Sequence, residues 1–107
     1  MTTFDERERS FEAKFAHDQE LEFKISARRN RLLGLWAGGL MGLGQKNLED
    51  YARAVVKSEL EQPGDDDVLR KLFEDLKGSG VSVTEGEVRL KMAELMAKAR
   101  EQLKVEG

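Results

Sequence analysis

The residues with the most potential for chemistry are a glycine-rich segment, three consecutive aspartates and a single histidine. Gly39 and Gly44 have the spacing of a phosphate-binding loop. However, Gln45 and Lys46 stand where that loop needs a lysine followed by a serine or threonine. No strand pattern precedes the segment, so we interpret it as a connection between two helices.

Metal binding and nucleophilic catalysis have few candidate residues in the sequence. The run 65–67 is all aspartate and lacks the alternating ligands and central glycine of a calcium loop, so we interpret it as a helix start. There is no cysteine, and His17 is the one histidine that could assist a serine. We therefore expect no catalytic residue, no metal site, no cofactor and no enzymatic activity. Histidine side chains can change charge near neutral pH, so His17 could act as a pH-dependent charge in this segment. An ordinary surface histidine is the favoured interpretation.

One basic cluster stands out. Arg28, Arg29 and Arg31, together with Lys24, place four positive charges within eight residues that include no acid. Such a patch could bind a nucleotide or nucleic acid, but a solvated helix face is the favoured interpretation. Arg29 lies on the apolar side of the helix, where its guanidinium could reach the solvent or pair with an acid of the same domain or of a partner.

The N-terminal segment carries three phenylalanines among mostly charged residues. Phe4, Phe11 and Phe15 are seven and four residues apart, which places them on one face of a helix. The apolar stripe continues through Leu21, Ile25, Leu32 and Trp36, with a change of phase after Phe15. Large apolar side chains on a charged helix are typical of a helix that binds in the groove of a partner.

Four helices are expected to position these residues. The first begins with a capping box at Thr3 and Glu6 and is ended by the glycines from Gly38 to Gly44. A second helix is expected from about Asn47 to the Pro63-Gly64 pair, and a third from Asp65 as N-cap to Gly78. The fourth begins at a capping box formed by Thr84 and Glu87, with Val83 and Val88 as a hydrophobic staple.

Composition restricts the class of protein. The chain has 107 residues, 36% of them charged and 39% hydrophobic, with a net charge of -3. These values predict one small domain. The slightly negative net charge does not favour binding to nucleic acid or to a membrane surface. The longest apolar stretch, 32–44, is too short to cross a bilayer, and no secretory signal is recognisable. We predict an all-α, four-helix bundle with a long first helix and a marginally stable N-terminal arm, in a soluble intracellular protein.

The sequence resembles the zeta subunits of alpha-proteobacterial F-type ATP synthases, which inhibit ATP hydrolysis. The similarity spans the chain and is dense over the first 45 residues. The matching segments are Thr3-Phe4-Asp5, Arg7-Glu8, Phe11-Glu12, 14–18, Phe23-Lys24, 27–30, 32–37, 67–71 and 91–96. The chain departs from the expected pattern at Gly38-Gly39, where a continuing helix would be usual, and in the loop 78–83.

The resemblance implies a four-helix protein whose N-terminal segment inserts at a catalytic interface of the ATPase head. The implied partners are the large catalytic and non-catalytic subunits and the central stalk, and no membrane insertion is implied. The protein would then be cytoplasmic and peripheral to the inner membrane through the synthase. Nucleic acid is not an expected partner, and a weak site for ADP or ATP is an alternative that the sequence leaves open.

Residues 1–18 are therefore predicted to form an inhibitory arm, and residues 19–107 a four-helix domain. A short charged helix is marginal alone, so the arm is expected to be disordered or frayed when free and helical when bound. The residues expected to contact the partner are Phe4, Asp5, Arg7, Arg9, Phe11, Lys14, Phe15 and His17. Arg28, Arg29 and Arg31 are expected as a secondary contact.

Overall fold

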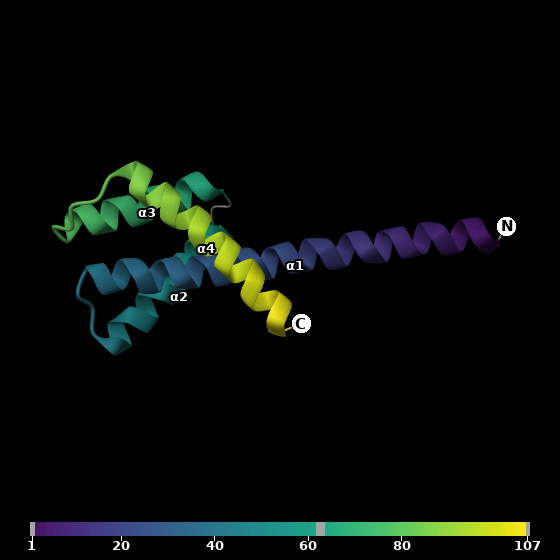
Figure 1. Cartoon of the computed structure of the whole chain (residues 1–107), viewed down its shortest axis with the longest axis horizontal. Helices are drawn as coiled ribbons and strands as arrows, with labels where there is room; N and C mark the ends of the chain where they lie inside the picture. Colours follow the sequence, from purple (N-terminus) through teal and green to yellow (C-terminus); the bar gives the residue numbers. More distant parts are fainter. Residues whose placement is uncertain (1, 62–63, 107) are drawn as a thin grey trace.

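The protein is all-α, and a computed structural model describes its backbone over residues 2–61 and 64–106 and its side chains over 18–61 and 64–104. Four helices occupy the described residues: α1 (Thr2–Leu40), α2 (Gln45–Glu61), α3 (Asp65–Gly78) and α4 (Glu85–Glu106). The predicted four-helix fold with a long first helix is confirmed. In Figure 1, α2 and α3 lie beside the C-terminal half of α1, and α4 crosses α1.

All four helices contribute to one core. Most of its buried side chains are aliphatic, and α3 alone contributes four of them because its apolar residues repeat at helical spacing. Trp36, Tyr51 and Phe73 pack half-buried at the edge of the core. The buried members are Leu33, Ala37, Val55, Val68, Leu69, Leu72, Leu76, Val88 and Met92.

The buried face of α1 differs from the predicted stripe. Ile25, Leu33 and Ala37 are buried, whereas Leu32 and Trp36 are half-buried and Leu21 is exposed. The face is rotated because α1 packs against α2 through small residues. A Cβ added to Gly34 would lie 2.5 Å from Cα of Ala52, and one added to Gly38 would lie 2.6 Å from Leu48 Cδ1. The glycine positions therefore let two helices approach closely, a role that periodicity of large residues does not reveal.

The prediction that the glycines from Gly38 to Gly44 end the first helix is confirmed for the position of the end, but Gly38 and Gly39 do not themselves end it. Both lie within α1, which stops at Leu40. Gly42, with φ 76°, adopts the left-handed conformation, and its N–H donates to Gly39 O at 3.1 Å while Leu43 N–H donates to Gly38 O at 3.0 Å. These two bonds form a Schellman motif, so one glycine beyond the helix supplies the stop.

The same motif ends α3. Gly80, with φ 80°, donates its N–H to Lys77 O at 3.1 Å, and Val81 N–H donates to Leu76 O at 2.9 Å. Gly78 is the last helical residue, as predicted, but Gly80 makes the turn possible. Val81 and Val83 then pack half-buried against the core.

Helix starts agree with the sequence in one case and differ in three. The backbone of α1 is already helical at Thr2, so Thr3 does not precede the helix as its cap. Thr84 Oγ1 accepts a hydrogen bond from Glu87 N–H at 3.1 Å, so the predicted cap of α4 is confirmed. By contrast, α2 starts at Gln45, before Asn47, and Leu48 N–H donates to Gly44 O at 2.7 Å. Asp65 is the first residue of α3 and not its cap; Gly64 occupies the cap position without a side-chain bond. Asp65 instead accepts a bond from another helix.

The molecule is elongated, with extents of 65 × 25 × 22 Å. Figure 1 shows why: the N-terminal part of α1 extends past the ends of the other three helices. The side chains of residues 18–24 are exposed, and Ile25 is the first buried residue of the described side chains. Residues 1–17, which hold the predicted partner contacts, are outside the described side chains.

Candidate partner-binding arm and its base

The predicted contact residues of the arm share one continuous helix with the four-helix domain. The backbone of α1 is helical from Thr2 to Leu40, without a break near residue 18. Phe4, Asp5, Arg7, Arg9, Phe11, Lys14, Phe15 and His17 all lie in its first part, outside the described side chains. What the structure describes in detail is the base of the arm, where α1 enters the domain.

Among the described side chains, the ion pair between helices that lies nearest the arm joins α1 to α4. Arg100 Nη1 and Nη2 donate to the two carboxylate oxygens of Glu22 at 2.7 and 3.2 Å. The Arg100 guanidinium lowers the pKa of Glu22, and the Glu22 carboxylate raises the pKa of Arg100. Residues 78 positions apart thus join where α1 leaves the domain.

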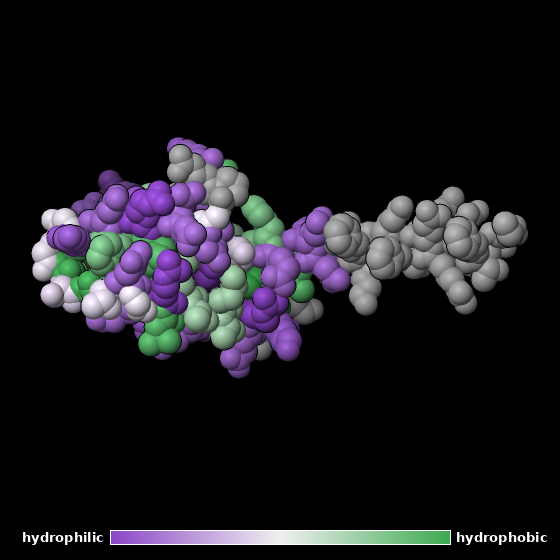
Figure 2. Space-filling view, turned by 90° about the horizontal axis from the view of Figure 1, so that it is seen from above, coloured by the Kyte–Doolittle hydropathy of each residue, from purple (hydrophilic) through white to green (hydrophobic). Residues whose placement is uncertain are grey.

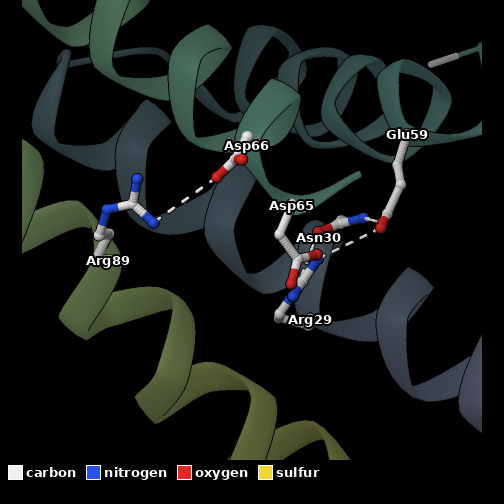
Figure 3. Close-up of polar contacts among 6 residues, drawn as sticks. All are labelled: Arg29, Asn30, Glu59, Asp65, Asp66 and Arg89. Atoms are coloured by element: carbon white, nitrogen blue, oxygen red, sulfur yellow. Dashed lines mark hydrogen bonds and ion pairs between the residues drawn. The ribbon is translucent and has the colours of Figure 1, made fainter. Parts of the chain in front are cut away.

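About two turns further along α1, a buried polar cluster ties α1 to α2 and α3 (Figure 3). The Arg29 side chain is 3% exposed, and its Nη2 lies 2.9 Å from Asp65 Oδ1 and 3.5 Å from Glu59 Oε1. Its Nε donates to Asn30 Oδ1 at 3.1 Å, and Asn30 Nδ2 donates to Glu59 Oε2. A buried guanidinium needs such partners because unpaired burial of a charge is costly. The open question of Arg29 is answered: it pairs with acids of its own domain.

The aspartate run contributes to a second contact of the same kind. Arg89 of α4 lies 3.7 Å from Asp66 Oδ1, so α1 and α4 each send an arginine to the start of α3 (Figure 3). Asp67 pairs with Arg70 within α3 at 3.4 Å. The three acids complement the positive end of the α3 dipole, as the sequence suggested, and two of them also join helices.

Three members of the predicted basic cluster pair with acids of the protein. Arg31 Nη1 lies 3.0 Å from Glu49 on α2, and Lys24 lies 3.6 Å from Glu20, one turn before it on α1. Arg29 is buried, and Arg28 is half-buried. A polyanion would have to compete with these partners, so the structure does not favour a nucleotide or nucleic-acid patch here.

Sequence reasoning missed the acids that serve these arginines. Glu49, Glu59 and Asp65 are 18, 30 and 36 residues away from their partners, so helical spacing could not indicate them. The usable signal was an arginine on an apolar helix face, which implies an acid somewhere in the domain. Which acid supplies it depends on how the helices pack.

The other candidate sites, namely the glycine segment, Trp36 and a metal site, show no arrangement for catalysis or ligand binding in the described residues. The glycine segment 41–44 is a turn between α1 and α2. Trp36 is half-buried at the core, with Lys91 Nζ 5.8 Å from its ring centroid. Over residues 18–61 and 64–104, no group of three or more His, Cys, Asp or Glu is arranged to hold a metal ion. No helix within the described part of the chain has the length and apolar character needed to cross a membrane.

Comparison with known proteins gives a family and a related structure. A family model described as "ATPase inhibitor subunit zeta" matches residues 1–102, which include the arm. A chain whose solution NMR structure is known is 42% identical, with a TM-score of 0.70, over 81% of this chain and 99% of that one. No curated protein matches the chain.

Proposed function

Because the chain belongs to the family of ATPase inhibitor subunits zeta, we propose that its N-terminal arm, residues 1–18, blocks ATP hydrolysis by an F-type ATP synthase. The observation that carries the proposal is the family match over residues 1–102, which covers the arm and the domain together. The projection of α1 past the other helices supports it, because a projecting helix can enter a cleft that the domain cannot (Figure 1).

In the proposed mechanism the arm inserts between a large catalytic and a large non-catalytic subunit of the head, against the central stalk. Phe4, Phe11 and Phe15 enter apolar pockets, while Arg7, Arg9 and Lys14 pair with acids of the head. Asp5 and His17 lie among these contacts. A wedge at this interface prevents the stalk from turning in the hydrolysis direction. The chain itself performs no catalysis and uses no cofactor in this mechanism.

The domain, residues 19–107, holds the arm in a defined place. Its ties at Glu22 and Arg29 fix α1 against the other helices just after the arm ends. The proposed location follows from the partner: cytoplasmic, and peripheral to the inner membrane through the synthase.

The decisive test compares ATP hydrolysis by the purified head with full-length protein and with protein lacking residues 1–18. We expect the shortened protein to keep the helical circular dichroism of the domain and to lose inhibition. Inhibition at full strength by the shortened form would refute the mechanism while leaving the family assignment intact.

A substitution pair within the arm refines that test. Phe11→Ala should weaken inhibition by about tenfold or more, as expected for an aromatic anchor in a binding pocket. Ser10→Ala, one position away and off the phenylalanine face, is the matched control and should inhibit like the natural protein. Equal potency of the two variants would remove Phe11 from the proposed contact.

A further inference from the structure

An apolar groove lies between α1 and α2 at the base of the arm. Its volume is about 350 Å³, and Phe23, Ala27, Val56 and Leu60 form its apolar walls, with Glu22 and Glu59 beside them. Phe23 is 57% exposed and Leu60 59% exposed, so each leaves more than half of a large side chain in water. We refer to it as the Phe23–Leu60 groove.

This combination differs from the other exposed apolar residues. Leu21, Leu40 and Leu90 are also exposed, but none of them lines this groove. Single exposed leucines are common on protein surfaces, whereas adjoining aromatic and aliphatic side chains at a groove usually mark an interaction site. On the face drawn in Figure 2, green apolar patches alternate with purple hydrophilic ones.

The groove lies directly beyond the arm on the same helix. Phe23 is five residues past residue 18, which corresponds to about 7.5 Å along a helix axis. Because α1 is continuous from Thr2 to Leu40, insertion of the arm into a cleft must bring this part of α1 to the mouth of that cleft.

We propose that the Phe23–Leu60 groove receives an apolar surface segment of a large subunit of the ATPase head, at the mouth of the cleft that the arm enters. This inference rests on the proposed function and extends its interface from the arm to the domain. Two half-exposed side chains supply far less than the roughly 800 Å² per partner of a stable interface. They are therefore too few to hold a second copy of this chain, but enough to extend an interface that the arm already makes.

Charge restricts the chemistry of that segment. The two charged residues that line the groove, Glu22 and Glu59, are both acidic and already paired, with Arg100 and with Arg29 respectively. Because each carboxylate is paired with an arginine, the groove offers no unpaired charge to attract a charged segment. The fitting partner presents an aliphatic or aromatic side chain with neutral neighbours.

Site-specific photocrosslinking on the full chain tests the proposal. A photoreactive phenylalanine analogue is placed at position 11, 23 or 90, and each protein is irradiated with the purified head. We expect crosslinks to a large subunit from positions 11 and 23 and none from 90. A crosslink from 11 without one from 23 overturns the groove contact and leaves the proposed function standing. Absence from 11 counts against both, and a crosslink from 23 to a second copy of this chain overturns the proposal.

A variant pair measures the contribution of the groove to binding. Phe23→Ala with Leu60→Ala should weaken binding to the head by roughly tenfold, since two apolar anchors are truncated. Leu40→Ala with Leu90→Ala removes similar exposed leucines elsewhere and should leave binding unchanged. Thermal unfolding checks that both double variants remain folded, which their exposure predicts. Equal affinity of the two double variants contradicts the proposal, whatever their stabilities.

Discussion

At Gly34, a single hydrogen in place of a side chain lets α1 approach α2. A Cβ there would lie 2.5 Å from the Cα of Ala52, which is backbone and cannot rotate away. We expect Gly34→Ala to lower the free energy of unfolding by about 1–3 kcal/mol, the usual range for overpacking. Chemical denaturation monitored by circular dichroism measures the change.

Gly39 provides the control within the same helix. It has no neighbouring atom within 4 Å of an added Cβ, and it is helical. Gly39→Ala should therefore stabilise the protein by up to about 1 kcal/mol, because alanine favours the helix. The opposite signs are the test: destabilisation of similar size by both changes would contradict the packing argument.

Arg29 is the residue whose removal should cost the domain most among its charged side chains. Arg29→Met keeps the aliphatic stem but leaves Glu59 and Asn30 without the guanidinium. We expect a loss of about 2–4 kcal/mol, reduced from the fully buried case because the Asp65 side chain is 64% exposed. The measurement is again denaturant unfolding.

Arg31→Met is the matched change two positions away. The side chains of Arg31 and its partner Glu49 are 48% and 40% exposed, so the loss should be at most about 1 kcal/mol. If the two arginine variants had the same stability, the buried cluster would have no special role in holding α1, α2 and α3 together.

Between the elements, the Glu22–Arg100 pair joins α1 to α4 at the base of the arm, and it should depend on pH. Its guanidinium partner lowers the pKa of Glu22 below the ordinary value of 4.5. A lowered pKa in the folded state means that the pair stabilises the fold above the ordinary value. That contribution is lost as the pH falls through the folded-state pKa.

An NMR titration of the Glu22 side chain tests this prediction. In the natural protein the midpoint should lie below the ordinary glutamate value of 4.5. In Arg100→Gln the midpoint should rise to the ordinary range. An unchanged midpoint in the variant would show that Arg100 is not the cause.

The presence of the four helices could be predicted from the sequence, but the residues at which they begin and end were harder to predict. The cap at Thr84 was correct because its bonds are local, between residues three positions apart. The stop of α1 was correctly placed among the glycines from Gly38 to Gly44, but the sequence did not show which of them supplies it; only Gly42 adopts a positive φ there. Gly34 and Gly38 serve packing against α2, and sequence alone cannot distinguish a packing glycine from a terminating one.

For the whole molecule, we predict that the arm and the domain differ in stability when the protein is free. The arm has three large apolar residues among charged ones, whereas α4 contributes Val88, Met92 and Ala99 to the buried interior. Amide protons of residues 5–15 should therefore exchange faster than those of residues 88–99. Hydrogen exchange followed by NMR gives both rates in one sample. Equal protection of the two segments would mean that the arm does not fold on binding.

The candidate site likewise has one part that the sequence predicts and one part that it does not. The face that carries Phe4, Phe11 and Phe15 could be read from spacing, because helix geometry is local and repeats every 3.6 residues. The partners of Arg29 and Arg31, and the groove between Phe23 and Leu60, could not. They join residues 18 to 37 positions apart, and their meeting depends on which helix faces pack together.

The sequence by itself determined an all-α chain of four helices, a charged first segment with a phenylalanine face, and one secure helix cap. These follow from interactions between near neighbours, which the order of residues specifies directly. Tertiary structure alone decided that Arg29 is buried between acids of two other helices and that α1 passes through Gly38. It also decided that an apolar groove opens at the base of the arm. The groove and the Arg29–Glu59 pair depend on the close approach of α1 to α2, which Gly34 and Ala52 permit but which the order of residues does not indicate.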